Sequence, residues 1–231
     1  LADLESLEKR LPNLEKKAKG NDKEAKLAIE LINRALVPLR DGKPARQTEV
    51  SDDERAAFVG LNLLTSKPVL YVCNVDEASA ESGNAFSQVV EKRAAEEGAQ
   101  TIIISAQIEA EVSQLDAEEA AEYLADLGLK EPGLNRLIRT GYNLLDLITY
   151  FTCGPKETRA WTINRGTKAP GAAGVIHTDF EKGFIRAETI AYPDYVEFQG
   201  ETGCKDAGKM RLEGKEYLVK DGDVMHFRFN V

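Results

Sequence analysis

The chain has 231 residues, of which 42% are hydrophobic and 30% are charged, and its net charge is −9. This composition predicts a soluble globular protein of one or two domains and excludes a disordered chain. No apolar run approaches the roughly 20 residues of a membrane span, and the negative net charge disfavours indiscriminate binding to nucleic acid, so neither a membrane nor DNA is expected as a partner.

Two amphipathic helices are predicted in the first 40 residues. In the first helix, leucines alternate between three- and four-residue spacing, the pattern of a coiled-coil seam: Leu4, Leu7, Leu11 and Leu14. Gly20 and Asn21 interrupt the pattern, and the second helix has its own apolar face: Ala28, Leu31, Ile32, Ala35, Leu36 and Leu39. Two such faces separated by a short break predict an antiparallel helical hairpin. Pro12 is expected to kink the first helix.

A βαβ unit is predicted after the hairpin. Two apolar runs without alternation, residues 69–73 and 101–105, are typical of parallel strands that are buried on both faces. The helix predicted between them, residues 86–98, has a distinct apolar face: Phe86, Val89, Val90 and Ala94. Because parallel strands end at the same edge of a sheet, Asn74 and Ser105 are expected to lie together. Ligands of open α/β sheets bind at that edge.

The last third of the chain has a different pattern. Two helices are expected over residues 116–126 and 134–147, and short β-like runs separated by glycine-containing turns follow: residues 148–153, 158–164, 184–192, 216–220 and 224–231. One helical piece, residues 173–180, interrupts the series. The predicted fold class is therefore α/β followed by α+β, with a helical hairpin, part of a parallel sheet and a small β-rich C-terminal domain.

Four blocks of the sequence, in this order, resemble the YchF family of Obg-like ATPases: LADLESLEKRLPNLEKK, YVCNVDE, IIISAQIE and GVIHTDFEKGFIRAE. The resemblance covers the whole chain. It implies a GTPase-type P-loop domain with an inserted coiled-coil hairpin, followed by a TGS domain with a ubiquitin-like β-grasp fold. The expected divisions are residues 1–66 for the hairpin, 67–145 for the C-terminal part of the nucleotide-binding domain and 146–231 for the TGS domain.

The phosphate-binding motif of such proteins, G-x-x-x-x-G-K-[ST], does not occur in this sequence. The resemblance implies that the motif and the Mg²⁺ ligands lie upstream of Leu1. It also implies an intact protein that hydrolyses ATP, associates with the ribosome and its RNA, and resides in the cytoplasm. Three scattered cysteines are consistent with reduced thiols in that compartment: Cys73, Cys153 and Cys204. We expect no catalytic residue and no metal ligand in this chain, and we predict that the chain alone is inactive.

The strand end NVDE, residues 74–77, takes the place of the N-K-x-D motif with which GTPases read guanine. Glu77 replaces the aspartate and is one methylene longer, so its carboxylate is expected to miss the two guanine donors. Asn74 can donate to adenine N7 and accept from the N6 amine, so a preference for ATP over GTP is expected. Ser105 and Ala106 resemble the base-supporting S-A-K/L loop. The predicted base-binding residues are Asn74, Val75, Glu77, Ser105 and Ala106.

Two residues of this strand end have an alternative role. Asp76 stands at the variable position of the motif and is expected to be only solvated. Glu77 is a candidate either for contact with the base or for capping the turn that follows the strand.

Five lysines surround the predicted turn of the hairpin: Lys16, Lys17, Lys19, Lys23 and Lys26. On an acidic protein this basic tip predicts a contact with ribosomal phosphates, and the alternative is a solvated helix end. The two histidines, His177 and His226, have no Cys or His partner at metal-ligand spacing. His177 is expected to make a structural hydrogen bond.

A second function, from a different class, is consistent with the same residues. It is a non-catalytic RNA-binding or regulatory module, in which the TGS domain is the working part and the βαβ unit is a scaffold. TGS-like blocks also occur in threonyl-tRNA synthetases and in stringent-response enzymes, so this block alone does not distinguish the two functions. A P-loop in the upstream coding sequence would favour the ATPase.

Overall fold

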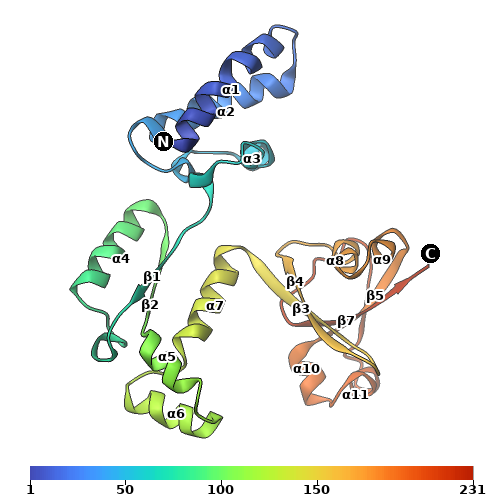
Figure 1. Ribbon diagram of the computed structural model, residues 1–231. Helices are drawn as coiled ribbons and strands as arrows, with labels where there is room; N and C mark the ends of the chain where they lie inside the picture. The colour runs from blue at the N-terminus through green and yellow to red at the C-terminus, as the bar shows by residue number, and fades with distance from the viewer. Residues whose placement is uncertain (231) are drawn as a thin grey trace. The chain divides into compact units, whose positions relative to one another are not determined.

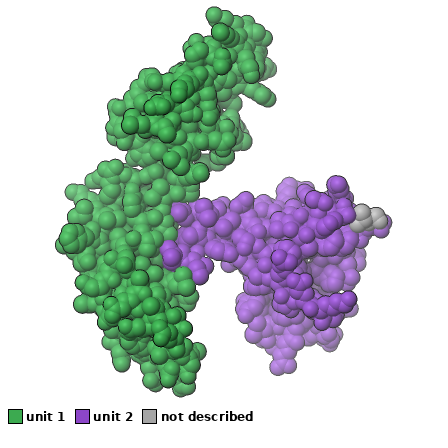
Figure 2. Space-filling model, viewed as in Figure 1, with its two compact units in different colours: residues 1–136 green, residues 137–231 purple. Residues whose placement is uncertain are grey.

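The computed structural model describes residues 1–230. The chain forms two compact units, one made of residues 1–136 and one that begins at residue 137 (Figure 2). Each unit has hydrophobic clusters of its own. None of the helices within the described residues is both long and apolar enough to cross a lipid bilayer.

The first unit begins with a pair of helices, α1 (Ala2–Ala18) and α2 (Lys23–Arg40), which pack side by side (Figure 1). The predicted apolar faces meet in one cluster, in which five side chains of the pair are almost fully buried: Leu7, Leu31, Ile32, Ala35 and Leu36. Asn21 turns the chain between the helices with a φ of 65°, a conformation that asparagine tolerates better than most residues. α1 continues through Pro12, which is exposed and does not end the helix.

Three short elements complete this cluster: η1 (Ala45–Gln47), α3 (Asp52–Val59) and η2 (Leu64–Ser66). α3 begins with a capping box in which Ser51 and Glu54 satisfy each other's backbone groups. The side chains that these segments bury against the helix pair are Ala45, Phe58, Leu61 and Leu63. The helix pair therefore has a hydrophobic core that includes segments well beyond its own two helices.

The predicted βαβ unit is present. β1 (Leu70–Asn74) and β2 (Gln100–Ile104) pair in parallel, and α4 (Ala85–Glu97) connects them. The expectation that the strands are buried on both faces is wrong, because Val72 of β1 is 48% exposed. The predicted apolar face of α4 is also largely in solvent, with Phe86 84% exposed and Val89 69% exposed. A sheet of two strands has too little surface to cover these side chains.

The rest of the first unit is helical: η3 (Glu77–Ser79), α5 (Ala106–Val112), α6 (Ala117–Asp126) and the start of α7 (Gly133–Leu144). Sequence patterns predicted α6 and α7 but missed α5, which follows β2 directly. Ala80, Ile108 and Leu124 form a small core among these elements. This core holds the segments that follow the two strands.

The second unit is built on a five-stranded mixed sheet in the order β4-β3-β7-β5-β6. Its strands are β3 (Leu147–Cys153), β4 (Thr158–Asn164), β5 (Phe184–Ala191), β6 (Arg211–Glu213) and β7 (Asp223–Phe229). The central pair, β3 and β7, is parallel, and the other neighbours are antiparallel. The expected α+β architecture of this part is therefore present.

Helices lie on both faces of this sheet: α8 (Ala169–Ile176), α9 (Thr178–Lys182), α10 (Tyr192–Glu197) and α11 (Glu201–Asp206). Alternate residues of a strand point to opposite faces. Tyr150 and Phe227 belong to the cluster beside α8, whereas Phe151 and Val224 belong to the cluster beside α10 and α11. The sheet thus separates two hydrophobic cores.

Two expectations for this unit are corrected, and a third is confirmed. Residues 216–220 form no strand, because their backbone bonds connect to the loop before α8, for example from Val219 N to Thr167 O at 3.0 Å. The edge strand that pairs antiparallel with β5 is instead β6. The predicted helix over residues 173–180 is two helices, α8 and α9, separated at His177. His177 accepts a hydrogen bond from the backbone of Asp179, so the structural bond expected for it is confirmed.

Candidate nucleotide-base edge

The ends of β1 and β2 lie at the same edge of the parallel sheet. Asn74 is paired in register with Ile104, and the N–H of Val75 donates to the carbonyl of Ile104 at 2.9 Å. The segments that follow the strands, residues 74–77 and 105–106, therefore begin next to each other. The geometry brings together four of the five residues that the sequence assigned to a base site, namely Asn74, Val75, Ser105 and Ala106.

Asn74 joins the two strand ends through its side chain. Its Oδ1 accepts a hydrogen bond of 2.9 Å from the backbone N–H of Ala106, one of the donors that helix α5 leaves unsatisfied at its N-terminus. With the carbonyl oxygen held by the protein, the Nδ2 amine is the group of Asn74 left to bind a ligand. Of the two hydrogen bonds expected between Asn74 and adenine, this orientation favours the one in which Nδ2 donates to adenine N7. The other, in which Oδ1 accepts from the adenine N6 amine, is less favoured because Oδ1 already accepts from Ala106.

Ser105 is buried at 3% exposure. Its backbone carbonyl accepts from Glu109 N at 3.1 Å, but within residues 1–230 its hydroxyl oxygen has no hydrogen-bond partner. A buried hydroxyl without a partner is costly. Ser105 thus has an unsatisfied polar atom at the residue that precedes Ala106 in the chain.

Asp76 and Glu77 have separate roles in the turn after β1. Asp76 caps η3, because its Oδ1 accepts from Ser79 N at 3.0 Å, so the expectation that Asp76 is only solvated is wrong. Asp76 therefore caps the turn after β1. The half-buried Glu77 does not fill this capping role, so its carboxylate is available for contact with a ligand.

Tyr123 and Glu111 form a further polar pair that the sequence did not predict, and the charge of Glu77 acts on Tyr123. The hydroxyl of Tyr123 donates to Glu111. This hydrogen bond, together with burial and the negative charges of Glu111 and Glu77, raises the pKa of Tyr123 to about 12. Both residues come from helices of ordinary amphipathic pattern, α5 and α6, and no motif in the sequence marks them.

Glu109 fixes the next helix onto this edge. Its carboxylate accepts from the N–H groups of Gly133 and Leu134 at 2.6 and 3.1 Å, which are the first residues of α7. A Cβ atom at position 133 would lie 2.9 Å from both Glu109 and Ile104, so only glycine allows this approach. Arg136 then donates to the carbonyl of Ile103 at 3.1 Å.

Two buried carboxylates fasten the helix pair to the segments around the sheet. Asp3, 6% exposed, accepts from Leu64 N, Thr65 N and the Thr65 hydroxyl at 2.8, 2.7 and 2.6 Å. Burial acts to raise the pKa of Asp3, but these hydrogen bonds outweigh it and hold that pKa below its usual value. Asp3 thereby joins the start of α1 to η2, the segment that leads into β1.

Glu97, at the end of α4, receives three partners from three segments: Tyr71 of β1, Arg93 of α4 and Arg46 of η1. Its side chain is 8% exposed. Burial acts to raise the pKa of Glu97, and the hydrogen bonds from Tyr71 and Arg93 with the charges of Arg93 and Arg46 lower it further than burial raises it. Glu97 is thus the polar connection between η1 and the sheet.

The five lysines predicted at the hairpin tip all lie in or beside the connection between α1 and α2, and all five are exposed: Lys16, Lys17, Lys19, Lys23 and Lys26. Lys26 donates to the Asn21 side chain at 2.6 Å. In the part of the chain that the structure describes, none of the five is paired with a carboxylate. Their positive charges are therefore open to solvent.

Parallel strands that end in polar residues at one edge, with a helix between them, and the similarity to a solved YchF GTPase place the first unit in the class of GTPase-like nucleotide-binding folds. Residues 147–230 match the family model YchF-GTPase_C, described as a protein of unknown function (DUF933). All 231 residues align with proteins named ribosome-binding ATPase YchF: the identity is 54% for Haemophilus influenzae and 51% for Escherichia coli O157:H7, each covered to 63%. For Bacillus subtilis the identity is 49%, with 64% of that protein covered.

Solved structures agree with these relatives. The YchF GTPase of Schizosaccharomyces pombe is similar with a TM-score of 0.83 and 38% identity, over 98% of this chain and 62% of that one. A GTP binding protein from Pyrococcus horikoshii OT3 has a TM-score of 0.52 at 18% identity, over 89% of this chain and 57% of that one, and shows the fold alone. The chain is a homologue of the YchF proteins along its entire length, as the four sequence blocks predicted, and spans 63% of the first relatives' length.

Proposed function

We propose that this chain is part of a ribosome-associated P-loop ATPase of GTPase-like fold, which binds ATP in preference to GTP and acts in the cytoplasm. The relatives named ribosome-binding ATPase support this assignment. In this proposal residues 1–66 are a hairpin insertion, residues 67–145 belong to the nucleotide-binding domain, and residues 146–231 are a TGS domain of β-grasp fold.

The observation that carries the proposal is the bond between Asn74 Oδ1 and Ala106 N. This bond joins the two strand ends and leaves the Asn74 Nδ2 group for a ligand, which supports a base site at this edge. Because N7 is present in both purines, Asn74 then selects a purine but does not separate adenine from guanine. Discrimination falls to the position of Glu77 and to Val75, where a guanine-reading site has an aspartate and a lysine.

Phosphate handling in this proposal lies outside the chain. The sequence contains no G-x-x-x-x-G-K-[ST] motif, so the groups that cradle the triphosphate and hold Mg²⁺ belong to another part of the protein. Base contacts alone offer one or two hydrogen bonds of roughly 0.5–1.5 kcal/mol each, too little for tight association. We expect the 231-residue chain to bind ATP no better than millimolar and not to hydrolyse it, and micromolar binding by calorimetry or turnover above buffer would contradict this.

The test of the base edge uses the intact protein, which binds nucleotide. Replacing Glu77→Asp together with Val75→Lys restores the side chains of the guanine-reading motif. One charge-assisted hydrogen bond gained, about 1.5–3 kcal/mol, raises GTP affinity roughly tenfold to a hundredfold. Affinities are measured by competition against a fluorescent ATP analogue.

Two further variants locate the effect. Asn74→Ala is expected to weaken ATP and GTP alike, because the donor to N7 and the anchor of Ala106 are both lost. Asp76→Ala serves as a control, since Asp76 caps η3 and does not face the base in this proposal. An unchanged ATP preference in the Glu77/Val75 double variant would exclude Glu77 from the base edge and leave discrimination to backbone groups near Ser105 and Ala106.

The lysine tip is the part of the chain that we propose contacts ribosomal phosphates. Changing Lys16, Lys19 and Lys23 to glutamate is expected to weaken co-sedimentation with ribosomes and to flatten its salt dependence, because fewer counterions are released. A matched control makes the same charge change at three exposed lysines away from the tip: Lys67, Lys92 and Lys130. If both triple variants lose the same amount of co-sedimentation, the loss is caused by the change in net charge, and a specific contact of the tip is excluded.

A second candidate function is a non-catalytic RNA-binding or regulatory module. It is favoured by one observation, namely that the second unit has its own five-stranded sheet and two cores. If that candidate is right, residues 137–231 expressed alone bind ribosomal RNA as tightly as the whole chain. If the ATPase proposal is right, loss of the lysine tip removes most of the binding.

A further inference from the structure

A cluster of three potential metal ligands lies in the second unit, far in sequence from the nucleotide edge. The imidazole of His226 and the carboxylates of Glu188 and Glu201 each place one ligand atom within 4.8 Å of the others. In the sequence, spacing predicted no metal site, because His226 has no Cys or His neighbour at ligand distance. The fold supplies two carboxylates instead.

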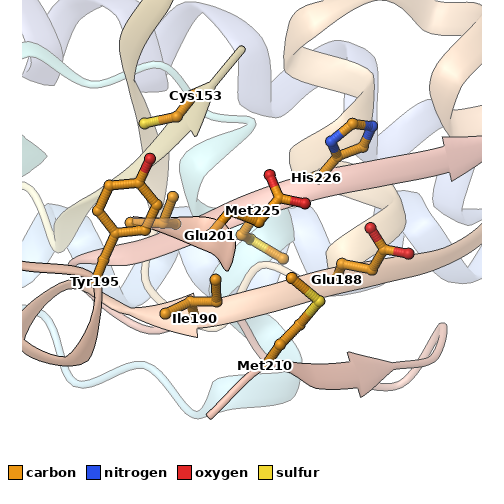
Figure 3. Close-up of a pocket in the computed structure, with 9 residues that line it drawn as sticks. Cys153, Glu188, Ile190, Tyr195, Glu201, Met210, Met225 and His226 are labelled. Carbon is orange, nitrogen blue, oxygen red and sulfur yellow. The ribbon is translucent and has the colours of Figure 1, made fainter. Parts of the chain in front are cut away.

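The arrangement is fixed by the sheet and by one glycine. Glu188 of β5 and His226 of β7 are directly opposite each other in the antiparallel pairing, so their side chains share a face. Glu201 is the first residue of α11 and approaches from the same side (Figure 3). Gly200, with a φ of 112° that favours glycine, turns the chain from α10 so that α11 begins at this point.

The three donors also line one cavity. Its volume is about 10 Å³, which is the size of a single water molecule or a metal ion. The cavity is also lined by Cys153, Ile190, Tyr195 and Met210 (Figure 3). Cys153 is not among the clustered donors, so the ligand set is one imidazole nitrogen and two carboxylate oxygens. Because Glu201 and His226 are exposed, water from the solvent can supply an additional ligand.

This donor set indicates the kind of ion. An imidazole with carboxylates suits Zn²⁺ and its late first-row neighbours, whereas Mg²⁺ and Ca²⁺ prefer oxygen ligands alone. Metal–ligand bonds of about 2.1 Å require the three atoms to approach to roughly 3.4 Å. Glu201 and His226 are exposed and free to make this adjustment.

The neighbouring charges set the affinity. Arg228 donates to both oxygens of Glu188, at 3.0 and 3.3 Å, which orients the carboxylate in the manner of an outer-shell partner. The positive charge of Arg186 also acts on Glu188. The same positive charges oppose a cation, so the ion is expected to bind reversibly rather than as a permanent structural metal.

We propose that Glu188, Glu201 and His226 form an exchangeable site for Zn²⁺ or a similar divalent transition metal, with water completing its coordination. A bound ion would connect β5, β7 and the first residue of α11. It would thereby fix α11 against the face of the sheet that α10 and α11 cover.

The experiment titrates the metal-free 231-residue chain with Zn²⁺ by calorimetry, with a phosphine reductant to keep the thiols reduced. Wild-type protein is expected to bind one equivalent, and both His226→Ala and Glu201→Gln to weaken it by at least about tenfold. His177→Ala is the matched control, because His177 is the other histidine and has a carboxylate, Asp179, at 3.5 Å. The control is expected to bind like wild type.

Two readouts make the result decisive. Co²⁺ bound at the proposed site gives visible d–d absorption without a thiolate charge-transfer band, and a strong charge-transfer band would assign the metal to cysteine and overturn the proposal. The midpoint of thermal unfolding is expected to rise with Zn²⁺ in wild type and in His177→Ala only. No one-to-one binding, or equal affinity in the His226 and His177 variants, also overturns it.

Discussion

The two units of the chain contain sheets of different completeness. In the second unit five strands place alternate side chains in two separate cores, and Tyr150 and Phe227 of the central strands are almost fully buried. In the first unit two strands of similar apolar character leave Val72 half exposed, and the neighbouring Phe86 of α4 lies 84% in solvent. An apolar run becomes a core strand only where enough neighbouring surface covers both of its faces.

The units also differ in charge and in how polar groups are used. Residues 137–231 contain as many basic as acidic side chains, so the first unit carries the whole net charge of −9. There, buried carboxylates connect elements that share little apolar surface, as Asp3 and Glu97 do. The second unit has one such buried carboxylate too, Asp223, which accepts hydrogen bonds from Tyr217 and Lys220, beside two hydrophobic cores that cover both faces of its sheet. The same physical forces thus contribute in different proportions to the two regions.

The largest expected effect contrasts two phenylalanines. Phe227→Ala removes a ring that packs against Tyr150 and Phe184 and is expected to cost about 3–5 kcal/mol of unfolding free energy. Phe86→Ala, at an exposed position, is expected to change stability by less than about 0.5 kcal/mol. Urea unfolding of each variant, followed by circular dichroism, measures both.

The Phe227→Ala and Phe86→Ala variants can also be tested in the intact protein, where they compare the coverage of the two units more directly. If other segments of that protein cover α4, Phe86→Ala becomes costly there while remaining neutral in the 231-residue chain. A large loss from Phe86→Ala in the 231-residue chain would contradict the description of the first unit as incompletely covered.

An intermediate effect is expected at Glu97. Glu97→Gln removes the charge on which Arg46, Arg93 and Tyr71 converge, and is expected to cost about 1–2 kcal/mol, reduced because Arg93 is exposed and partly screened by water. The matched control is Glu96→Gln, at the preceding, exposed position, which is expected to be neutral. Equal effects of the two variants in urea unfolding would show that the polar connection contributes nothing.

The smallest expected effect is a pH dependence of the first unit. The pKa values of Asp3 and Glu97 lie below their usual values of 3.8 and 4.5, so the unfolded state binds more protons than the folded one in this range. Stability from both groups is full above those values and is lost as the pH falls through the lowered pKa values.

Unfolding experiments at neutral pH and at pH about 3 measure this loss. Asp3→Asn is expected to reduce the difference between the two conditions, and Asp41→Asn, which changes an exposed carboxylate, to leave it unchanged. If wild type and Asp3→Asn lose the same unfolding free energy between neutral and acid pH, Asp3 does not contribute to the pH dependence of stability.

Local patterns predicted much of the fold. The leucine spacing of α1 and the unbroken apolar runs of β1 and β2 are short-range signals, and the corresponding elements are present. Errors arose where pairing partners lie far away in sequence. Residues 216–220 have strand-like composition, yet their backbone bonds connect to the loop before α8, and the true strand, β6, is only three residues long.

In the candidate site, too, local patterns predicted some features, and features that depend on distant contacts were missed. The sequence places Asn74 and Ala106 at one edge because both follow parallel strands, but the direction of the Asn74 amide depends on a hydrogen bond that no motif records. Tyr123 and Glu111 carry no signal at all. The register that sets Glu188 opposite His226 depends on the pairing of β5 with β7, which spacing alone cannot predict.

The exposed lysines between α1 and α2 have a kinetic consequence. The first unit as a whole is acidic and repels a nucleic acid, whereas the lysine tip attracts it, so encounters in other orientations are slowed before any contact forms. Discrimination of this kind acts on the association rate constant and needs no additional bond in the complex. It vanishes at high ionic strength, where the screening length falls to roughly 3 Å at 1 M salt.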